Sequence, residues 1–254
     1  MTRIPNIFSA GLWGFCLVFL FLGNGCKSDL SGSTIDLLLI EGHKQFAGKN
    51  YVKSKTSYTY LLEKNPQSET RAQGILGLAD SHYKLLEFEE ASIEYQKFLN
   101  LHPADDEAPR VLFFIGMCNF RQMLTLDRDQ TKTLDAERNF KIFLERYPDH
   151  ILSDTAKKNL QTCQKNYANH LFYIGKYYYR TEAYHSAINR MKELLEKYPD
   201  ETFVPEALFY LADSLYKEES YEKSIRAFDS LIKLFPRSEF AKMAKERKNE
   251  IGLN

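Results

Sequence analysis

The sequence predicts an all-α fold, a right-handed solenoid of helix-turn-helix repeats closed by a helix at the C-terminus. The first observation is five prolines that each end an amphipathic helix, since their rings cannot continue the hydrogen-bond ladder: Pro66, Pro103, Pro148, Pro199 and Pro236. The second is a fixed spacing before each proline, with a small residue twelve positions upstream and bulky residues eight and five upstream. These offsets place the three residues on one helix face.

The packing residues of the predicted second helices share this spacing. The small residues are Ser54, Ala91, Ala136, Ala187 and Ser224, and the bulky pairs are Tyr58 and Leu61, Tyr95 and Phe98, Phe140 and Phe143, Met191 and Leu194, and Phe228 and Leu231. A third observation is a small residue in each first helix, where two antiparallel helices approach closely: Gly42, Ala79, Gly116, Gly175 and Ala212. This unit of about 34 residues is typical of the tetratricopeptide repeat.

Five repeats are expected, at about residues 35–68, 72–105, 109–150, 168–201 and 205–238. Because each repeat buries its apolar face only against its neighbours, residues 35–254 are predicted to form one continuous domain. The chain carries 34 basic and 34 acidic residues, so its net charge is zero. A nucleic-acid-binding protein needs a basic stripe to displace counterions from phosphates. The composition therefore argues against a nucleic-acid partner.

Residues 1–25 differ from the rest and are predicted to be an export signal. Arg3 precedes an apolar run from Ile7 to Leu22, and small residues then lead to Cys26. The segment resembles a bacterial lipoprotein signal, which implies that Cys26 is acylated and begins the mature chain. That pattern usually has leucine three residues before the cysteine, where this chain has Gly23. The alternative is an uncleaved membrane anchor, although 16 apolar residues fall short of the ~20 needed to span a bilayer.

Residues 26–34 are expected to comprise the acylated cysteine and a short polar tether. Lys27 follows the cysteine, and resemblance to known sorting rules then implies the outer membrane. Thr34 is expected to cap a first helix over 35–47, with a second over 51–64. The second repeat is expected over 72–101, with its turn near residues 87–89.

The third repeat departs from the pattern, because eight extra residues separate its two small positions. Helices are expected over 108–123 and 133–147, with an insertion at 124–132; such insertions map to surface loops, often on a working face. A helical stretch over 153–169 continues without a breaker into the first helix of the fourth repeat. Residues 238–251 form a polar closing helix that covers the last apolar face.

Two cysteines, Cys118 and Cys163, remain in the mature chain. Pairing in an oxidising compartment is one possibility. The other, favoured because each lies in an apolar-periodic helix, is that they are separate buried residues.

No motif for catalysis or phosphate binding occurs, so no enzyme activity and no cofactor are predicted. The six histidines show no metal-ligand spacing and are read as surface or capping residues: His43, His82, His102, His150, His170 and His185. Asp127 and Asp129 suggest a calcium loop, but Lys132 and Arg138 stand where such a loop has glycine and glutamate. The two aspartates are instead expected to cap or ion-pair the insertion, and no metal site is predicted.

With no catalytic motif, the candidate function of these repeats is binding through their surface. Four residues past each small position of the first helices stands an aromatic residue, next to a cation in all but the first repeat: Phe46, Tyr83 with Lys84, Phe120 with Arg121, Tyr179 with Arg180, and Tyr216 with Lys217. One interpretation is that these rings pack between repeats. The other is a groove of aromatic anchors and cations that binds an extended peptide.

Further residues carry a family resemblance: the insertion aspartates, Phe143 to Pro148, Asp154 to Lys157, Tyr177 to Tyr179, and Asn189-Arg190 followed by Tyr198 to Asp200. With the lipoprotein signal, the insertion and the long helix, they resemble the BamD family of outer-membrane assembly lipoproteins. The resemblance implies a lipid-anchored protein on the periplasmic face of the outer membrane, within the machine that assembles β-barrel proteins.

The resemblance also implies partners. The amino-terminal repeats, with Phe46, Tyr83, Lys84, Phe120 and Arg121, would receive unfolded outer-membrane proteins, and other assembly lipoproteins would join. The carboxy-terminal repeats, with Tyr179, Arg190 and Tyr216, would hold BamA, and Arg190 would contact its last POTRA domain. The alternative function is a periplasmic scaffold for cell-wall synthesis or division of the CpoB-like kind. Such proteins usually carry a coiled coil before the repeats, and no heptad run stands between Cys26 and Ile35.

Overall fold

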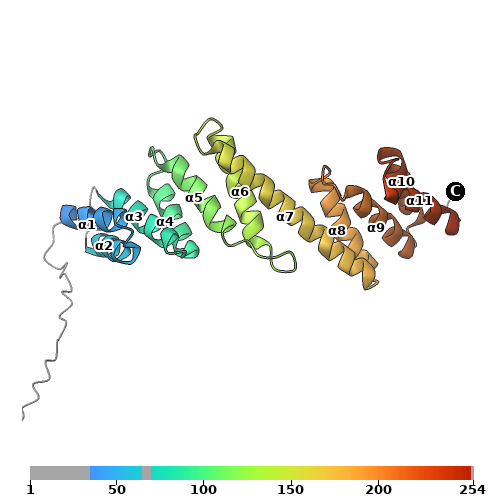
Figure 1. The fold of residues 1–254 in the computed structure, drawn as a ribbon, viewed down its shortest axis with the longest axis horizontal. Helices are drawn as coiled ribbons and strands as arrows, with labels where there is room; N and C mark the ends of the chain where they lie inside the picture. Colours follow the sequence, from blue (N-terminus) through green and yellow to red (C-terminus); the bar gives the residue numbers. More distant parts are fainter. Residues whose placement is uncertain (1–34, 65–69, 253–254) are drawn as a thin grey trace, which may run out of the picture. The chain divides into compact units, whose positions relative to one another are not determined.

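The computed structural model describes residues 35–64 and 70–252 of the 254-residue chain. Within these ranges it contains eleven α-helices and no strand (Figure 1). The helices are α1 (Ile35–Ala47), α2 (Tyr51–Lys64), α3 (Arg71–Lys84), α4 (Phe88–Leu101), α5 (Ala108–Phe120), α6 (Thr131–Arg146), α7 (Ser153–Arg180), α8 (Tyr184–Lys197), α9 (Val204–Lys217), α10 (Tyr221–Leu234) and α11 (Glu239–Glu250). The predicted signal peptide, Cys26, the tether, Thr34 and Pro66 lie outside the described residues.

The helices form a tetratricopeptide-repeat solenoid, in which each helix packs against the next one along the chain. The five repeats are α1 with α2, α3 with α4, α5 with α6, the second half of α7 with α8, and α9 with α10; α11 packs on α9 and α10. The predicted continuation into the fourth repeat is confirmed, since α7 runs unbroken for 28 residues. Ser238 caps the closing helix by accepting a hydrogen bond from the Ala241 amide at 3.1 Å.

Three predicted boundaries were wrong by a few residues. Helix α5 ends at Phe120 rather than residue 123, and Met123 turns inward to lie 3.7 Å from the Cys163 sulfur. Helix α6 begins at Thr131 rather than 133 because Asp129 accepts a hydrogen bond from the Thr131 amide at 2.9 Å. The turn of the second repeat lies at residues 85–87, and Phe88 already belongs to α4.

The predicted packing positions are confirmed. Every small and bulky residue named above for the second helices is at most 1% exposed. The glycines of the first helices lie against the bulky residues: a Cβ on Gly42 would lie 2.6 Å from the Tyr58 ring, and one on Gly175 would lie 2.7 Å from Met191 Cε. Two of the small pairs are also hydrogen-bonded, since Ser54 Oγ donates to the Gly42 carbonyl and Ser224 Oγ to that of Ala212. Small residues thus set the close helix approach in each repeat.

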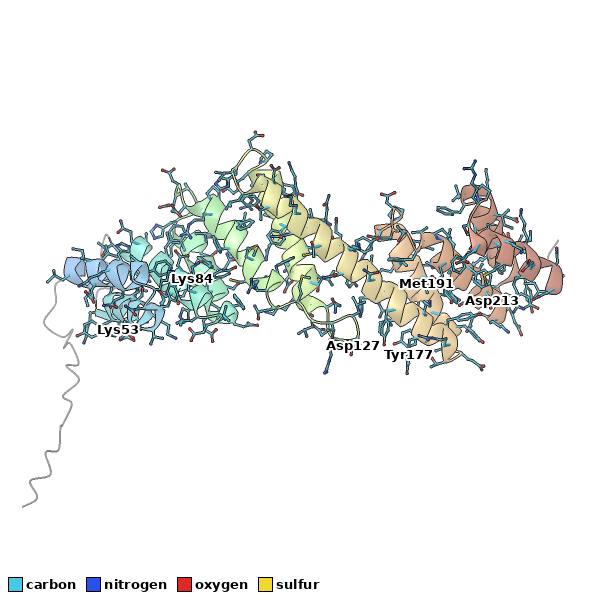
Figure 2. The ribbon with its side chains drawn as sticks, in the orientation of Figure 1. Lys53, Lys84, Asp127, Tyr177, Met191 and Asp213 are labelled. Carbon is cyan, nitrogen blue, oxygen red and sulfur yellow. The ribbon has the colours of Figure 1, made fainter. Side chains whose placement is uncertain are left out.

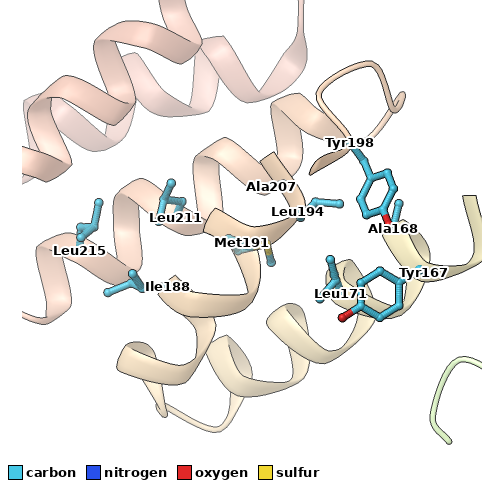
Figure 3. Packing of buried hydrophobic residues seen from close by; sticks show 10 residues of the cluster. All are labelled: Tyr167, Ala168, Leu171, Ile188, Met191, Leu194, Tyr198, Ala207, Leu211 and Leu215. Atoms are coloured by element: carbon cyan, nitrogen blue, oxygen red, sulfur yellow. The ribbon is translucent and has the colours of Figure 1, made fainter. Parts of the chain in front are cut away.

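Helix α7 takes part in two separate cores. Its first half contributes Ala156 and Cys163 to the core of the third repeat, with Phe140 and Phe143. Its second half contributes Leu171 to the core of the fourth repeat, where Met191 and Leu194 are fully buried (Figure 3). One continuous helix therefore joins the third and fourth repeats.

The reversal from first to second helix uses the same backbone in four repeats. The turn residue seven positions after the small residue has a positive φ in each: Lys49 (61°), Leu86 (63°), Glu182 (60°) and Glu219 (56°). This left-handed conformation costs a non-glycine residue about 1–2 kcal/mol. An edge-on or tilted contact between rings flanks the turn, as between Tyr83 and Phe88 at 5.4 Å. In the third repeat the insertion replaces this turn.

Cys118 and Cys163 are buried and not bonded to each other, as the favoured interpretation held. Burial raises the pKa of both thiols to about 12. The reactive thiolate is then about a thousandfold scarcer at neutral pH than in an exposed cysteine. We expect neither thiol to react with Ellman's reagent in a folded chain that begins at Lys27, and both to react in guanidinium. A chain that stays unreactive when unfolded without reductant would show a disulfide instead.

Across the described ranges, no helix combines the length and the apolar character that crossing a bilayer requires.

Candidate functional site

The insertion of the third repeat is a structured loop. Asp129 accepts a hydrogen bond from the amide of Thr131, the first residue of α6, and Asp127 accepts one from the Thr125 hydroxyl at 2.7 Å. These bonds lower the pKa of both carboxyl groups. Both aspartates are therefore hydrogen-bonded within the insertion, which fits a structural role for them. In the part of the chain that the structure describes, no three His, Cys, Asp or Glu side chains gather in a way that would hold a metal ion.

The predicted aromatic anchors are all partly buried. Tyr83 lies edge-on between Phe88 of its own repeat and Phe114 of the next, at 5.4 and 5.1 Å between ring centroids. Phe120 packs on Phe140 at 6.1 Å. These are contacts of rings that pack within and between repeats. Peptide contact by Tyr83 and Phe120 stays a prediction.

Their neighbouring cations lie closer to the solvent. Lys84 and Arg121 are both exposed (Lys84 in Figure 2). The Arg121 guanidinium lies 5.7 Å from the centroid of the Phe88 ring, so part of its charge is already engaged. Peptide binding by Lys84 and Arg121 therefore stays a prediction. The Arg121 guanidinium lies over a ring of the preceding repeat.

An open cavity of about 510 Å³ lies between α1, α3 and α5. Its lining includes His43, Phe46, Tyr58, Leu76, Asp80 and Arg110. Asp80 binds the Arg110 guanidinium at 3.0 and 3.3 Å and also accepts the Tyr95 hydroxyl. The cavity therefore combines apolar side chains with charges that are already paired. Of the predicted anchors, Phe46 is the one that lines it.

The ion pair beside this cavity recurs along the solenoid. In three first helices, the residue that follows the small position forms an ion pair with a residue of the next helix but one. The pairs are Asp80 with Arg110, Lys176 with Glu206 at 2.6 Å, and Asp213 with Arg247 at 2.6 Å. Each pair joins neighbouring units rather than helices of one repeat. These pairs thus fasten α3 to α5, α7 to α9 and α9 to α11.

Tyr179 and Tyr216 belong to the last of these fastenings. Tyr179 donates its hydroxyl to Asp213 at 2.7 Å, and its ring lies 4.8 Å from Tyr210. Burial, reinforced by the bond to Asp213, raises the Tyr179 pKa. The Arg247 guanidinium lies 5.8 Å from the Tyr216 ring. The two predicted partner-binding tyrosines therefore support the junction of α7, α9 and α11, and only their remaining surface is open to a partner.

Arg190 lies on α8 with 43% of its side chain exposed. Its guanidinium donates to Glu193 at 3.2 Å, the neighbour expected for an ordinary surface arginine. Glu193 also accepts from Lys197 at 2.8 Å and Tyr167 at 3.0 Å. Burial raises the pKa of Glu193, but these hydrogen bonds outweigh it and lower the pKa overall. Arg190 is thus one of several donors to Glu193 and can be withdrawn without leaving that carboxylate unpaired.

Two adjoining cavities of about 490 and 370 Å³ lie where α6, α7 and the end of α8 meet. Gln164, Lys197 and Tyr198 line both. The Tyr198 hydroxyl donates to the buried Glu137 at 3.2 Å, and burial next to this carboxylate raises the tyrosine pKa. Tyr198 of the Tyr-Pro-Asp motif therefore holds the end of α8 against α6.

Sequence reasoning did not predict that α7 exposes an aromatic stripe. Tyr173 and Tyr177 are 45% and 52% exposed and lie one helical turn apart (Tyr177 in Figure 2). His170, one turn earlier, contacts the Leu126 carbonyl of the insertion at 2.7 Å. At the position of Tyr177 the second, third and fifth repeats have the buried residues Ser81, Cys118 and Ser214. A tyrosine where other repeats have a small residue was the signal available in the sequence.

Known protein families match most of this chain. A family described as outer membrane lipoprotein (YfiO) matches residues 36–219, and the tetratricopeptide repeat family matches residues 206–238. An outer membrane protein assembly factor BamD from Caulobacter vibrioides is 24% identical over 68% of this chain and 57% of its own length. A BamD from Xylella fastidiosa is 25% identical over 82% of this chain and 76% of its own.

Solved structures were also compared. A TPR repeats protein from Bacteroides fragilis superposes with a TM-score of 0.46 at 14% identity, over 85% of this chain and 99% of its own. The chain thus spans little more than half of the Caulobacter relative, but the outer membrane lipoprotein match covers most of the chain itself. The chain therefore belongs to the outer membrane lipoprotein family that includes the BamD assembly factors.

Proposed function

We propose that this protein is a non-enzymatic lipoprotein subunit of the machinery that assembles β-barrel proteins in the outer membrane. The observation that carries the proposal is the family match over residues 36–219, which includes the insertion and the whole of α7. The relatives matched over much of the chain are named outer membrane protein assembly factors. Acyl chains on Cys26 hold the protein at the periplasmic face of the outer membrane.

The described surfaces support a division of labour along the solenoid. The cavity lined by Phe46, Leu76 and Arg110 suits an extended segment that inserts an apolar side chain between charged residues at the cavity edge. An unfolded barrel precursor offers such extended segments. The carboxy-terminal repeats offer Arg190 and the stripe of Tyr173 and Tyr177 to a folded partner, which we take to be a BamA POTRA domain. Other assembly lipoproteins bind elsewhere on the surface.

Exchanging the charge of Arg190 tests this assignment. Arg190→Glu is expected to abolish co-purification of BamA from detergent-solubilised envelopes, because an arginine at a protein interface grips a carboxylate that a glutamate repels. The melting temperature should not change, since Glu193 keeps its bonds to Lys197 and Tyr167. Mass spectrometry of the co-purified proteins gives the readout.

The matched control is Arg226→Glu. Arg226 lies on the second helix of the fifth repeat, is 64% exposed and pairs with Glu222 one turn away at 2.7 Å. This variant should retain BamA. If both variants retain it, Arg190 makes no essential contact; if the unmodified protein recovers cell-wall enzymes and no barrel-assembly components, the proposed function is wrong.

A further inference from the structure

The first repeat leaves an apolar face uncovered that the inner repeats bury. The residues two and five positions before the small residue of a first helix pack on the preceding repeat in the second, third and fifth repeats. Val111 and Ala207 at the earlier position are fully buried, and a Cβ on Gly77 at the later position would lie 2.2 Å from the Tyr58 ring. In α1 these positions hold Leu37 and Ile40, which are 55% and 60% exposed.

The opposite end of the solenoid is closed. Helix α11 buries Ala241 and Ala244 completely and packs Phe240 against the core of the fifth repeat. On α1 the exposed stripe continues instead to Lys44, one turn past Ile40, whose side chain is 76% exposed. Its pairing with Glu41 is long, at 3.9 Å, and such exposed pairs contribute little. The stripe thus has two aliphatic residues followed by a cation, as in helices that lie in a membrane interface.

The tether determines what this face can reach. Eight residues, 27–34, separate Cys26 from the start of α1. Even fully extended, eight residues reach at most about 29 Å. If Cys26 carries acyl chains, as in the function proposed above, α1 remains within about that distance of the bilayer. The local concentration of lipid at the stripe is then high, so that even a weak interaction is populated.

We propose that the exposed stripe of α1, Leu37, Ile40 and Lys44, docks on the lipid bilayer surface. The two aliphatic side chains enter the boundary between headgroups and acyl chains, and the lysine extends to a lipid phosphate. The acyl anchor supplies the residence on the membrane, and the stripe sets the orientation of the first repeat. This inference rests on the proposed function only for the position of the anchor.

A tryptophan probe tests the docking without the acyl chain. Trp13 is the only tryptophan of the chain, so a chain that begins at Lys27 has none. It keeps all of the described helices, from α1 to α11. A hexahistidine segment in place of residues 1–26 binds it to vesicles of phosphatidylcholine and phosphatidylglycerol that contain nickel-chelating lipid. Ile40→Trp is the probe, and Ile93→Trp on α4, where Ile93 is 64% exposed, is the matched control.

Brominated acyl chains are expected to quench the fluorescence of the Ile40→Trp probe about two-fold or more and to leave that of the Ile93→Trp control unchanged. Adding Lys44→Glu to the probe should reduce the quenching. Equal quenching in the probe and the control, or none in the probe, would overturn the proposal. So would a probe emission that is already blue-shifted before vesicles are added, because the face would then be covered by the chain itself or by a second copy. The intact mass of the exported protein tests acylation separately, so failure of the anchor and failure of the docking are distinguishable.

Discussion

Replacing Gly77 by alanine is expected to destabilise the first two repeats by about 1–3 kcal/mol, the usual cost of overpacking a core. The sign is informative, because alanine in a helix interior is normally about 1 kcal/mol more favourable than glycine. Here the added Cβ would lie 2.2 Å from Tyr58 Cζ. The ring cannot retreat, since it is only 1% exposed and Gly42 stands against it from α1. Urea unfolding followed by circular dichroism measures the change.

Gly48→Ala is the control. Gly48 is the turn residue that directly follows α1, and an added Cβ there would meet its nearest neighbours at 3.3 Å. Its effect should be within about 0.5 kcal/mol, as for most surface changes. A double-mutant cycle with Tyr58→Leu isolates the clash: in the background of the smaller residue, Gly77→Ala should lose most of its cost. An unchanged cost in that background would mean that Tyr58 is not the obstacle.

Replacing Asp213 by alanine is expected to loosen α11 and to cost about 3 kcal/mol, the lower end of the range for breaking a buried ion pair from one side. Asp213 is 2% exposed and accepts from Arg247 at 2.6 Å and from the Tyr179 hydroxyl at 2.7 Å. Its removal leaves both donors without that acceptor. Arg247 is 26% exposed and keeps a bond to Glu250, which limits the loss. Thermal melting and hydrogen exchange of the α11 amides give the measurement.

Asp229→Ala removes a second carboxylate that binds α11. Asp229 accepts from Lys248 at 2.7 Å, but it is 57% exposed, and exposed pairs contribute about 0–1 kcal/mol. Each variant removes a carboxylate that binds α11, from α9 or from α10, and the two carboxylates differ in burial. Equal melting temperatures would show that the bonds of Asp213 do not hold the closing helix.

The repeat phase could be predicted from the sequence because it depends on side-chain volume at fixed spacing. A small residue such as Ala91 twelve positions before a proline, with Tyr95 and Phe98 after it, admits one buried face only. The ends of α5 and α6 could not be predicted in the same way. They depend on Met123 reaching Cys163, forty residues away, and on Asp129 accepting a hydrogen bond from the first amide of a helix that the insertion displaces.

The residue types of the candidate site could be predicted from the sequence, but the exposure of their side chains could be predicted less well. An aromatic ring next to a cation is equally typical of a groove and of a packed junction. The difference for Tyr83 comes from Phe114 in another repeat, and for Tyr179 from a hydroxyl bond to Asp213, thirty-four residues away. The exposure of Tyr177 was missed because it depends on how the fourth repeat meets the third, which the repeat spacing alone does not specify.

The unbroken helix α7 also fixes the distance and the relative rotation between the two faces that it presents to the third and fourth repeats. Its 28 residues rise about 42 Å at 1.5 Å per residue, and each residue turns the helix by about 100°. The face that Ala156 and Cys163 present to the third repeat and the face that Leu171 presents to the fourth are therefore fixed in azimuth as well as in separation. One residue more or less between positions 163 and 171 would twist the two faces apart by that angle, whereas a loop would absorb it. The length of this segment is constrained by geometry independently of its composition.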